Sequence, residues 1–227
     1  YSHQTDNKPF SRGGTKNIGF LAIKKKYPEN YKNITFVFND VDTLPSIKNM
    51  FNYQTSKGLV KHFFGFNFTL GGIFSITGED FERCNGFPNL YGWGLEDNTM
   101  NDRVKSANIK IDRSNFYPIR SKKILNIYDG PNRLINNKEP SNYNKHLLND
   151  NLSDIKNLDY TIVLNKEFSN INNDNEFMIN INNFDSLINP RTEEFYIQDI
   201  SKSNKMKIDV LEKQRLREQW SMKRMML

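Results

Sequence analysis

A short apolar run followed by two acidic residues is the feature that most constrains how this chain folds. Residues 34–38 read Ile-Thr-Phe-Val-Phe, without alternation of apolar and polar side chains, and Asp40 and Asp42 follow closely. Such a run predicts a strand covered on both faces, as in the sheets of α/β proteins. Ligands of open α/β sheets bind at the carboxyl ends of the strands. We therefore expect an α/β fold with a ligand site around these aspartates.

Helix and strand signals surround this run. Thr15 is a candidate N-cap for a helix that continues to about Lys26, and Pro28 ends it. Residues 113–151 are expected to form a long loop, and residues 182–199 to be weakly structured. The remaining patterns predict strands at 59–68, 73–76 and 109–112, helices ending at 83 and spanning 96–106, a strand pair at 158–164 and 177–181, and an amphipathic helix at 205–227.

The composition indicates a folded protein and narrows the choice of partners. The chain has 227 residues, of which 13% are aromatic, enough for one core of ordinary size. Its net charge of +6 attracts phosphate groups in general. No arginine-rich stripe is interleaved with aromatic residues, so a nucleic acid is not the expected partner. Binding of nucleic acid by the basic residues 113–151 stays open as an alternative.

Cysteine usage predicts a reducing compartment such as the cytoplasm. Cys84 is the sole cysteine, so the chain cannot form an internal disulfide. The sequence contains no signal peptide and no run of the roughly 20 apolar residues that a membrane span needs. Because the chain begins with Tyr1 rather than Met, we expect a processed product or a piece of a longer protein.

Residues 92–98, Gly-Trp-Gly-Leu-Glu-Asp-Asn, form a second candidate region. Trp93 offers a flat apolar face that suits the C–H face of a sugar ring, with ordinary core packing as the alternative. Asp97 beside Glu96 can serve as a general base toward a sugar hydroxyl. In the Asp40-X-Asp42 pair one carboxylate can reach a divalent cation and the other a ligand hydroxyl, with helix capping as the alternative. Together these features favour nucleotide-sugar chemistry.

Three blocks, in this order, resemble the β-1,4-galactosyltransferase family. They are residues 36–45 (FVFNDVDTLP), 71–75 (GGIFS) and 85–97 (NGFPNLYGWGLED). The similarity extends back to residues 9–20 and forward, more faintly, to about residue 180. It implies an A-type glycosyltransferase fold, with a Rossmann-like mixed sheet flanked by helices. Residues 1–190 would form the catalytic domain, and residues 191–227 a C-terminal extension.

The resemblance also implies an activity and the residues that carry it. The family uses manganese to transfer galactose, with inversion, from UDP-galactose to the 4-hydroxyl of a terminal sugar on a glycan or glycoprotein. Asp97 matches the general base and Asp42 a metal ligand. The other matching positions are Asp40, Phe10, Arg12 and Gly72 in the donor site, Glu96 as a sugar-binding acid, and Trp93 as the loop residue that closes over the donor and contacts the acceptor.

Several positions depart from the family pattern. Leu95 replaces a second glycine after the tryptophan, which lowers the expected flexibility of the loop. Asn126 stands where the family has a metal-binding histidine, so manganese binding is expected to be weak or lost. Thr69 stands where a tyrosine restricts the donor to galactose, which leaves N-acetylgalactosamine open as a donor sugar. The family's disulfide cysteines are absent, as expected for a reducing compartment.

The resemblance does not include the βαβ unit that holds uridine in the family and precedes the segment matched here by residues 9–20. We therefore expect a fold that is incomplete at the N-terminus and is completed by another segment. The alternative function is a catalytically inactive relative, a glycan-binding or assembly module. For residues 205–227, packing on the domain and contact with a protein or a membrane surface both stay open.

Overall fold

The structure is a computed structural model, and it describes residues 1–127, 130–136, 150–164 and 177–199. Its helices are α1 (Arg12–Lys26), α2 (Gly78–Arg83) and α3 (Glu96–Ser106), with short 3-10 turns at Tyr31–Asn33, Leu152–Asp154 and Pro190–Thr192. In the part of the chain described, no helix is long and apolar enough to cross a membrane. The segment 205–227, expected to be an amphipathic helix, lies outside the described residues.

A mixed sheet forms one half of the fold. Its strand order is β2 (Thr35–Asn39), β5 (Ile73–Thr77), β4 (Leu59–Gly65) and β6 (Lys110–Asp112), with β7 (Tyr117–Pro118) also paired to β4. The pairs β2–β5 and β4–β5 are antiparallel, whereas β4–β6 is parallel. An aromatic core that includes Phe20, Phe38, Phe74, Phe81 and Phe87 packs between this sheet and the helices.

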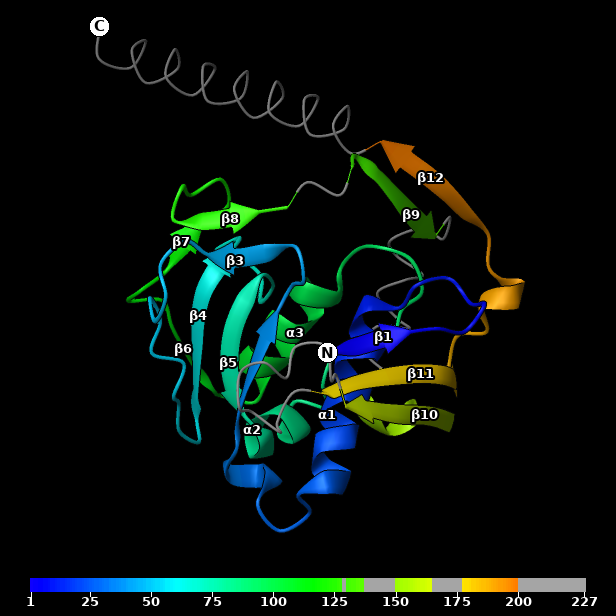
Figure 1. The fold of residues 1–227 in the computed structure, drawn as a ribbon, viewed down its shortest axis with the longest axis horizontal. Helices are drawn as coiled ribbons and strands as arrows, with labels where there is room; N and C mark the ends of the chain where they lie inside the picture. The colour runs from blue at the N-terminus through cyan, green and yellow to red at the C-terminus, as the bar shows by residue number, and fades with distance from the viewer. Residues whose placement is uncertain (128–129, 137–149, 165–176, 200–227) are drawn as a thin grey trace, which may run out of the picture.

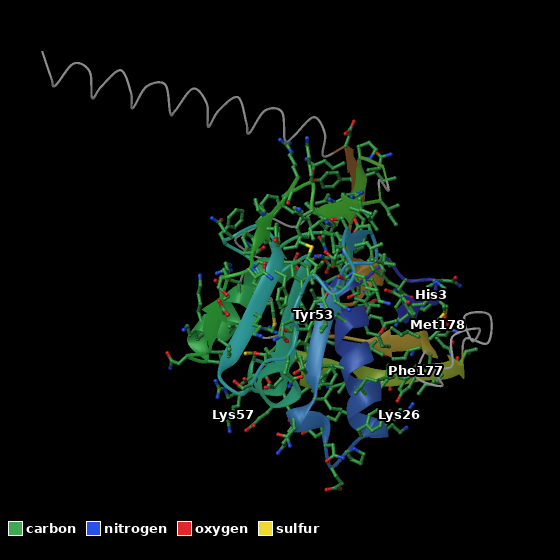
Figure 2. All side chains as sticks on the ribbon, turned by 60° about the vertical axis from the view of Figure 1, so that its left-hand side comes forward. His3, Lys26, Tyr53, Lys57, Phe177 and Met178 are labelled. Carbon is green, nitrogen blue, oxygen red and sulfur yellow. The ribbon has the colours of Figure 1, made fainter. Side chains whose placement is uncertain are left out.

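A second sheet lies on the other side of α1 (Figure 1). It has the order β1 (Ser2–Gln4), β11 (Phe177–Asp185) and β10 (Lys156–Leu164), with β1 parallel and β10 antiparallel to β11. Ile18 and Ala22 of α1 belong to the core of this side, whereas Phe20 belongs to the other core. Lys26 at the end of α1 places its Nζ 4.4 Å from the centre of the Phe177 ring (Figure 2).

Two short ribbons lie at one end of the molecule, toward the top of Figure 1. One pairs β3 (Thr43–Pro45) with β8 (Ile124–Asn126), and the other pairs β9 (Asn132–Asn136) with β12 (Phe195–Asp199), both antiparallel.

Two segments that were expected to be irregular contain strands. The segment 182–199 was expected to be weakly structured, but β11 extends to Asp185 and β12 follows. The segment 113–151 was expected to be a long loop, but it contains β7, β8 and β9. Each of these strands pairs with a segment far away in sequence, and local patterns do not reveal such a partner.

The first helix begins four residues earlier than expected. Ser11, not Thr15, is the N-cap, and its Oγ accepts a hydrogen bond from the Gly14 N–H at 3.2 Å. Gly13 lies inside the helix although glycine disfavours helices. A Cβ on Gly13 would come within 2.0 Å of the Pro88 carbonyl oxygen, so close packing against that segment explains the glycine.

The apolar run at residues 34–38 forms a strand, but this strand is not covered on both faces. Only Phe38 is buried in β2, and Val37 is 40% exposed. Within the described residues, β2 stands at the end of the sheet order, so only β5 hydrogen-bonds to it. The strands expected at 73–76 and 109–112 are found as β5 and β6, the helices expected to end at 83 and to span 96–106 as α2 and α3, and the expected strand pair as the antiparallel β10 and β11. The strand expected at 59–68 is shorter, because β4 ends at Gly65 and the chain turns before Gly71.

Candidate functional site

Three carboxylates and two cations converge at one place. Arg12 Nη1 lies 2.8 Å from both Glu96 Oε1 and Asp97 Oδ2, and Arg12 Nη2 donates to Asp40 Oδ2. Lys16 Nζ lies 3.0 Å from Asp40 Oδ1 and 4.0 Å from Asp97 Oδ1. The five side chains are at most 21% exposed. This cluster, called the carboxylate cluster below, brings together four of the residues expected in the site and adds Lys16.

Backbone contacts on either side of Gly71 hold the two aspartates of the cluster together. The Leu70 N–H donates to the Asp97 carbonyl at 3.0 Å, and the Asp40 N–H donates to the Gly72 carbonyl at 3.0 Å. A Cβ on Gly71 would lie 2.1 Å from Asp97 Oδ2, so a larger residue would overlap with the carboxylate. The loop between β4 and β5 therefore sets where Asp97 stands relative to Asp40.

The loop that carries Trp93 is attached to the start of α1 and to β9. The Gly92 N–H donates to the Phe10 carbonyl at 2.9 Å, and the Trp93 N–H to the Leu134 carbonyl at 2.7 Å. Phe10 is 54% exposed and Trp93 46% exposed, so the alternative of core packing for Trp93 does not hold. Both aromatic rings stay accessible on segments that adjoin the carboxylate cluster.

Leu95 adopts an unusual backbone conformation at the N-cap of α3. Its φ is 65°, in the left-handed region, and its side chain makes no capping hydrogen bond. A leucine in this region costs about 1–2 kcal/mol. Glu96 Oε2 instead accepts from the Gly94 N–H at 3.0 Å. The residue that replaces the expected glycine is thus accommodated with strain at the start of the helix that presents Glu96 and Asp97.

The two aspartates of the cluster differ in acidity. Burial alone would raise the pKa of Asp40, but Lys16 and Arg12 outweigh it and lower the pKa to about 2. For Asp97, burial raises the pKa, with Glu96 and Asp40 acting in the same direction against Lys16 and Arg12. Asp40 therefore stays ionised at neutral pH, while Asp97 is the carboxylate with the greater affinity for a proton.

Lys16 was not expected in the site. The signal that could have identified it is its spacing, since it follows Arg12 by four residues and so lies on the same face of α1. Its Nζ also lies 4.9 Å from the centre of the buried Phe87 ring. The family resemblance assigned a role to Arg12 but none to Lys16.

The candidate metal ligands lie at the β3–β8 ribbon, where Asp42 directly precedes β3 and Asn126 ends β8. Asn126 pairs with Thr43, the residue after Asp42, and the Ile127 N–H donates to the Asp42 carbonyl at 2.7 Å. A carboxylate and an amide oxygen are ligands that Mn²⁺ or Mg²⁺ accepts, so this donor set fits a hard divalent cation. Within the described residues there is no group of three or more His, Cys, Asp or Glu side chains that could hold a metal.

His62 does not replace the missing histidine ligand. It is 1% exposed, its Nε2 lies 3.0 Å from the Phe64 carbonyl oxygen, and its Nδ1 accepts from Arg113 Nε at 3.0 Å. Burial and the Arg113 charge lower the pKa of His62 to about 4. His62 is a neutral core residue, and His146 lies outside the described residues.

Thr69 and Gly72 flank the Leu70–Gly71 segment that contacts Asp97. Thr69 is 5% exposed, and its carbonyl accepts from Arg113 Nη2 at 3.2 Å. Gly72 has a φ of +67°, and a Cβ there would lie 2.4 Å from the Phe64 carbonyl oxygen. The expected donor-site residues thus lie on segments that contact one another, whereas the pair at Asp42 and Asn126 lies along the adjoining ribbon.

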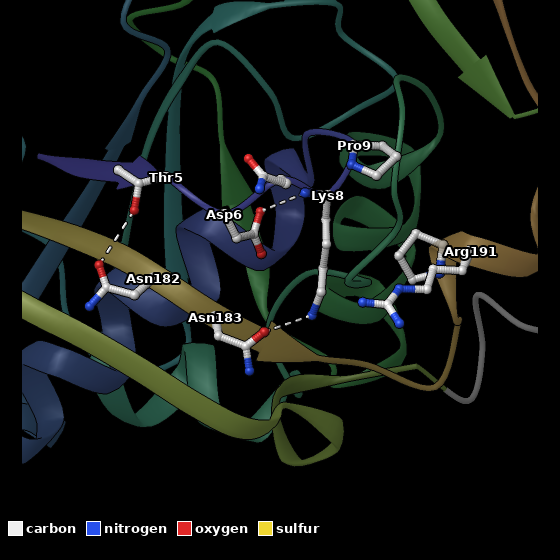
Figure 3. Close-up of a pocket in the computed structure, with 9 residues that line it drawn as sticks. Thr5, Asp6, Lys8, Pro9, Asn182, Asn183 and Arg191 are labelled. Carbon is white, nitrogen blue, oxygen red and sulfur yellow. Dashed lines mark hydrogen bonds between the residues drawn. The ribbon is translucent and has the colours of Figure 1, made fainter.

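A cavity of about 400 Å³ lies apart from the carboxylate cluster. Most of the residues that line it are polar or charged. Figure 3 shows Lys8 pointing to Asn183, with its Nζ 3.0 Å from Asn183 Oδ1. The residues that line it are Thr5, Asp6, Asn7, Lys8, Pro9, Asn182, Asn183, Pro190 and Arg191. The cavity shares no residue with the carboxylate cluster.

Comparison with known proteins identifies relatives of the central region. A family model described as the N-terminal domain of galactosyltransferase matches residues 60–129. β-1,4-Galactosyltransferase 4 of Cricetulus griseus is 37% identical over 124 residues, and the human protein of that name is 36% identical over 122 residues. The alignments cover 50% and 49% of this chain. They span 34% of the length of each of these two relatives.

Solved structures extend the similarity to most of the fold. The catalytic domain of Drosophila β-1,4-galactosyltransferase 7, in complex with xylobiose, superposes with a TM-score of 0.57. The superposition covers 83% of this chain and 79% of that chain at 19% identity, which shows a shared fold. A variant of the same protein, in complex with manganese, UDP-Gal and xylobiose, superposes equally well. The expected A-type glycosyltransferase fold is confirmed. In sequence, about half of the chain is similar to β-1,4-galactosyltransferases.

Proposed function

We propose that this chain forms the catalytic part of an inverting glycosyltransferase. The donor is a UDP-sugar carrying galactose or N-acetylgalactosamine, and the acceptor is a sugar hydroxyl on a glycan or glycoconjugate. The observation that carries the proposal is the carboxylate cluster, in which Arg12 bridges Asp40, Glu96 and Asp97. These four positions come from three separate sequence segments, all of which resemble the family.

Asp97 is the general base of the proposed reaction. Its raised pKa favours proton uptake, whereas Asp40, with a pKa of about 2, is too weak a base for this role. Asp97 takes the proton of the acceptor hydroxyl while that oxygen forms a bond to the anomeric carbon of the donor. The bond from the anomeric carbon to UDP breaks on the opposite face, which inverts the configuration.

The other residues bind and orient the two substrates. Glu96, 3% exposed, contacts a sugar hydroxyl, and the half-exposed Trp93 covers the sugar and excludes water. The guanidinium of Arg12 is suited to the oxygens of a diphosphate. Asp42 and Asn126 would hold a divalent cation, which neutralises charge on the departing diphosphate when bound.

The test is the release of UDP from UDP-galactose or UDP-N-acetylgalactosamine in the presence of acceptor sugars and Mn²⁺. Asp97→Asn keeps the shape of the side chain but removes the base, so we expect a loss of at least about 100-fold in kcat. Asp102→Asn is the matched control, because Asp102 is an exposed aspartate on the same helix. Unchanged transfer by the Asp97→Asn protein would refute the assigned role.

A catalytically inactive glycan-binding module is the second candidate. It is favoured by Asn126 at the position of the family's metal-binding histidine, because an amide oxygen is a weaker ligand than imidazole for a transition metal. This candidate predicts that acceptor sugars bind to the protein by calorimetry while no UDP is released under any metal condition. UDP release that depends on an acceptor sugar would exclude it.

A further inference from the structure

Lys16 and Arg12 stand one helical turn apart and face the same two aspartates. Arg12 contacts Asp40 Oδ2 and Asp97 Oδ2, whereas Lys16 lies opposite Asp40 Oδ1 and Asp97 Oδ1. Each cation therefore faces one oxygen of each carboxylate. The Lys16 side chain is 13% exposed, less than either aspartate. This arrangement differs from an exposed surface ion pair, which contributes little.

The two oxygens of Asp97 have different surroundings. Oδ2 accepts a hydrogen bond from Arg12 Nη1 at 2.8 Å. Oδ1 is buried and, within the described residues, has no hydrogen-bond partner; the Lys16 ammonium lies 4.0 Å from it. An ionised carboxylate oxygen that is out of contact with water needs a nearby positive charge. Lys16 supplies that charge for Asp97 Oδ1, called the inner oxygen below.

The charges around Asp97 show why a second cation is needed there. Arg12 and Lys16 face it from α1, Asp40 from the end of β2, and Glu96 from its own helix. Three carboxylates thus share two cations within the cluster. If Arg12 turns toward a diphosphate, as the proposed function requires, Lys16 is the cation of this group that stays beside Asp97.

We propose that Lys16 is a positioning residue that keeps Asp97 ionised and correctly oriented while Arg12 binds the donor. This inference rests on the proposed function, in which Asp97 is the base. Lys16 does not contact the reacting atoms. It acts on Asp97 through the inner oxygen Oδ1, and through Asp40, which it holds beside Asp97.

The experiment compares Lys16→Met and Lys16→Arg in the full chain. Lys25→Met is the matched control, because Lys25 is an exposed lysine of the same helix whose Nζ lies 5.9 Å from the centre of the Tyr160 ring, away from the cluster. Two properties are measured: the titration of the Asp97 carboxyl carbon by NMR, which needs no substrate, and the pH dependence of kcat for UDP release. Thermal unfolding establishes that each variant folds, and Lys16→Gln replaces Lys16→Met if the latter does not fold.

In the Lys16→Met protein we expect Asp97 to titrate at a pH about one unit higher, because a positive charge 4.0 Å from its carboxylate has been removed. The acid limb of the kcat profile should move by the same amount, and Lys16→Arg should restore both. An Asp97 titration in Lys16→Met equal to that of Lys25→Met would overturn the proposal. Absence of UDP release by the unmodified protein would count against the proposed function instead, since the NMR titration is independent of turnover.

Discussion

At the scale of single residues, the site depends on positions where an added side-chain atom would overlap with a neighbouring group. Gly71 is required because a Cβ there would lie 2.1 Å from Asp97 Oδ2, and the backbone on either side of it bonds to the two aspartates. Leu95 shows the opposite case, in which a residue with a Cβ occupies the left-handed region at the start of α3. Gly71 is therefore required by its contact with the Asp97 side chain, whereas Leu95 is accommodated with backbone strain.

Gly71→Ala should displace Asp97 and strongly reduce transfer, because the added methyl group overlaps with the carboxylate. We expect kcat for UDP release to fall at least about tenfold, with a loss of stability of about 1–3 kcal/mol from overpacking. Urea unfolding and a transfer assay measure the two effects. Gly58→Ala is the control, since it strains the backbone at φ +81° but its Cβ meets nothing within 4 Å. Equal activity in the two variants would contradict the steric explanation.

At the scale of elements, α1 connects the two halves of the fold and also presents both cations of the cluster. Its Phe20 packs on the central sheet and its Ile18 on the other core, while Arg12 and Lys16 reach the end of β2 at Asp40. The ion pairs therefore contribute to the docking of α1 against β2. Because the pKa of Asp40 is lowered in this contact, the contribution of the ion pairs to stability depends on pH.

The stability contributed by Asp40 should be lost in acid. Its pKa is about 2 in the folded protein, against an ordinary value of 3.8 for an aspartate, so the folded state favours the ionised form. The contribution, on the order of 2 kcal/mol, is fully present above about pH 5 and disappears as the pH falls toward about 2. Urea unfolding of the unmodified protein and of Asp40→Asn should differ by this amount at pH 6, and the difference should shrink in acid. A difference that is constant from pH 6 to pH 2 would contradict the ionic explanation.

At the scale of the whole molecule, the carboxylate cluster and the Asp42–Asn126 pair lie on different elements. The cluster lies where α1, α3 and the end of β2 meet, and the pair lies at the β3–β8 ribbon, which begins at Thr43, three residues after Asp40. In the proposed function, a UDP-sugar with a divalent cation would contact both regions. Ligand binding should therefore stabilise the fold as a unit.

Asn126→His should strengthen metal binding, because imidazole is a better ligand than an amide oxygen for a transition metal. We expect the dissociation constant for Mn²⁺ in the presence of UDP to decrease at least about tenfold, and the rise in melting temperature with UDP and Mn²⁺ to increase. Electron paramagnetic resonance titration of free Mn²⁺ measures the affinity. Asn52→His, at an exposed position outside the ribbon, is the control. Equal affinity in the two variants would place the metal elsewhere.

The sequence by itself determined the strand that ends at Asn39, just before Asp40, the helix at 96–106 and the loop that carries Trp93, because apolar spacing and glycine placement act locally. The segments that resemble a known family also indicated four of the five residues of the cluster. Tertiary structure alone decided the half-exposed state of β2, the pairing of β12 with β9 and the position of Lys16. Each of these depends on contacts between residues distant in sequence, such as Phe195 with Asn136 and Lys16 with Asp97. Local propensity carries no information on such contacts, because packing and charge pairing are settled only when the chain is folded.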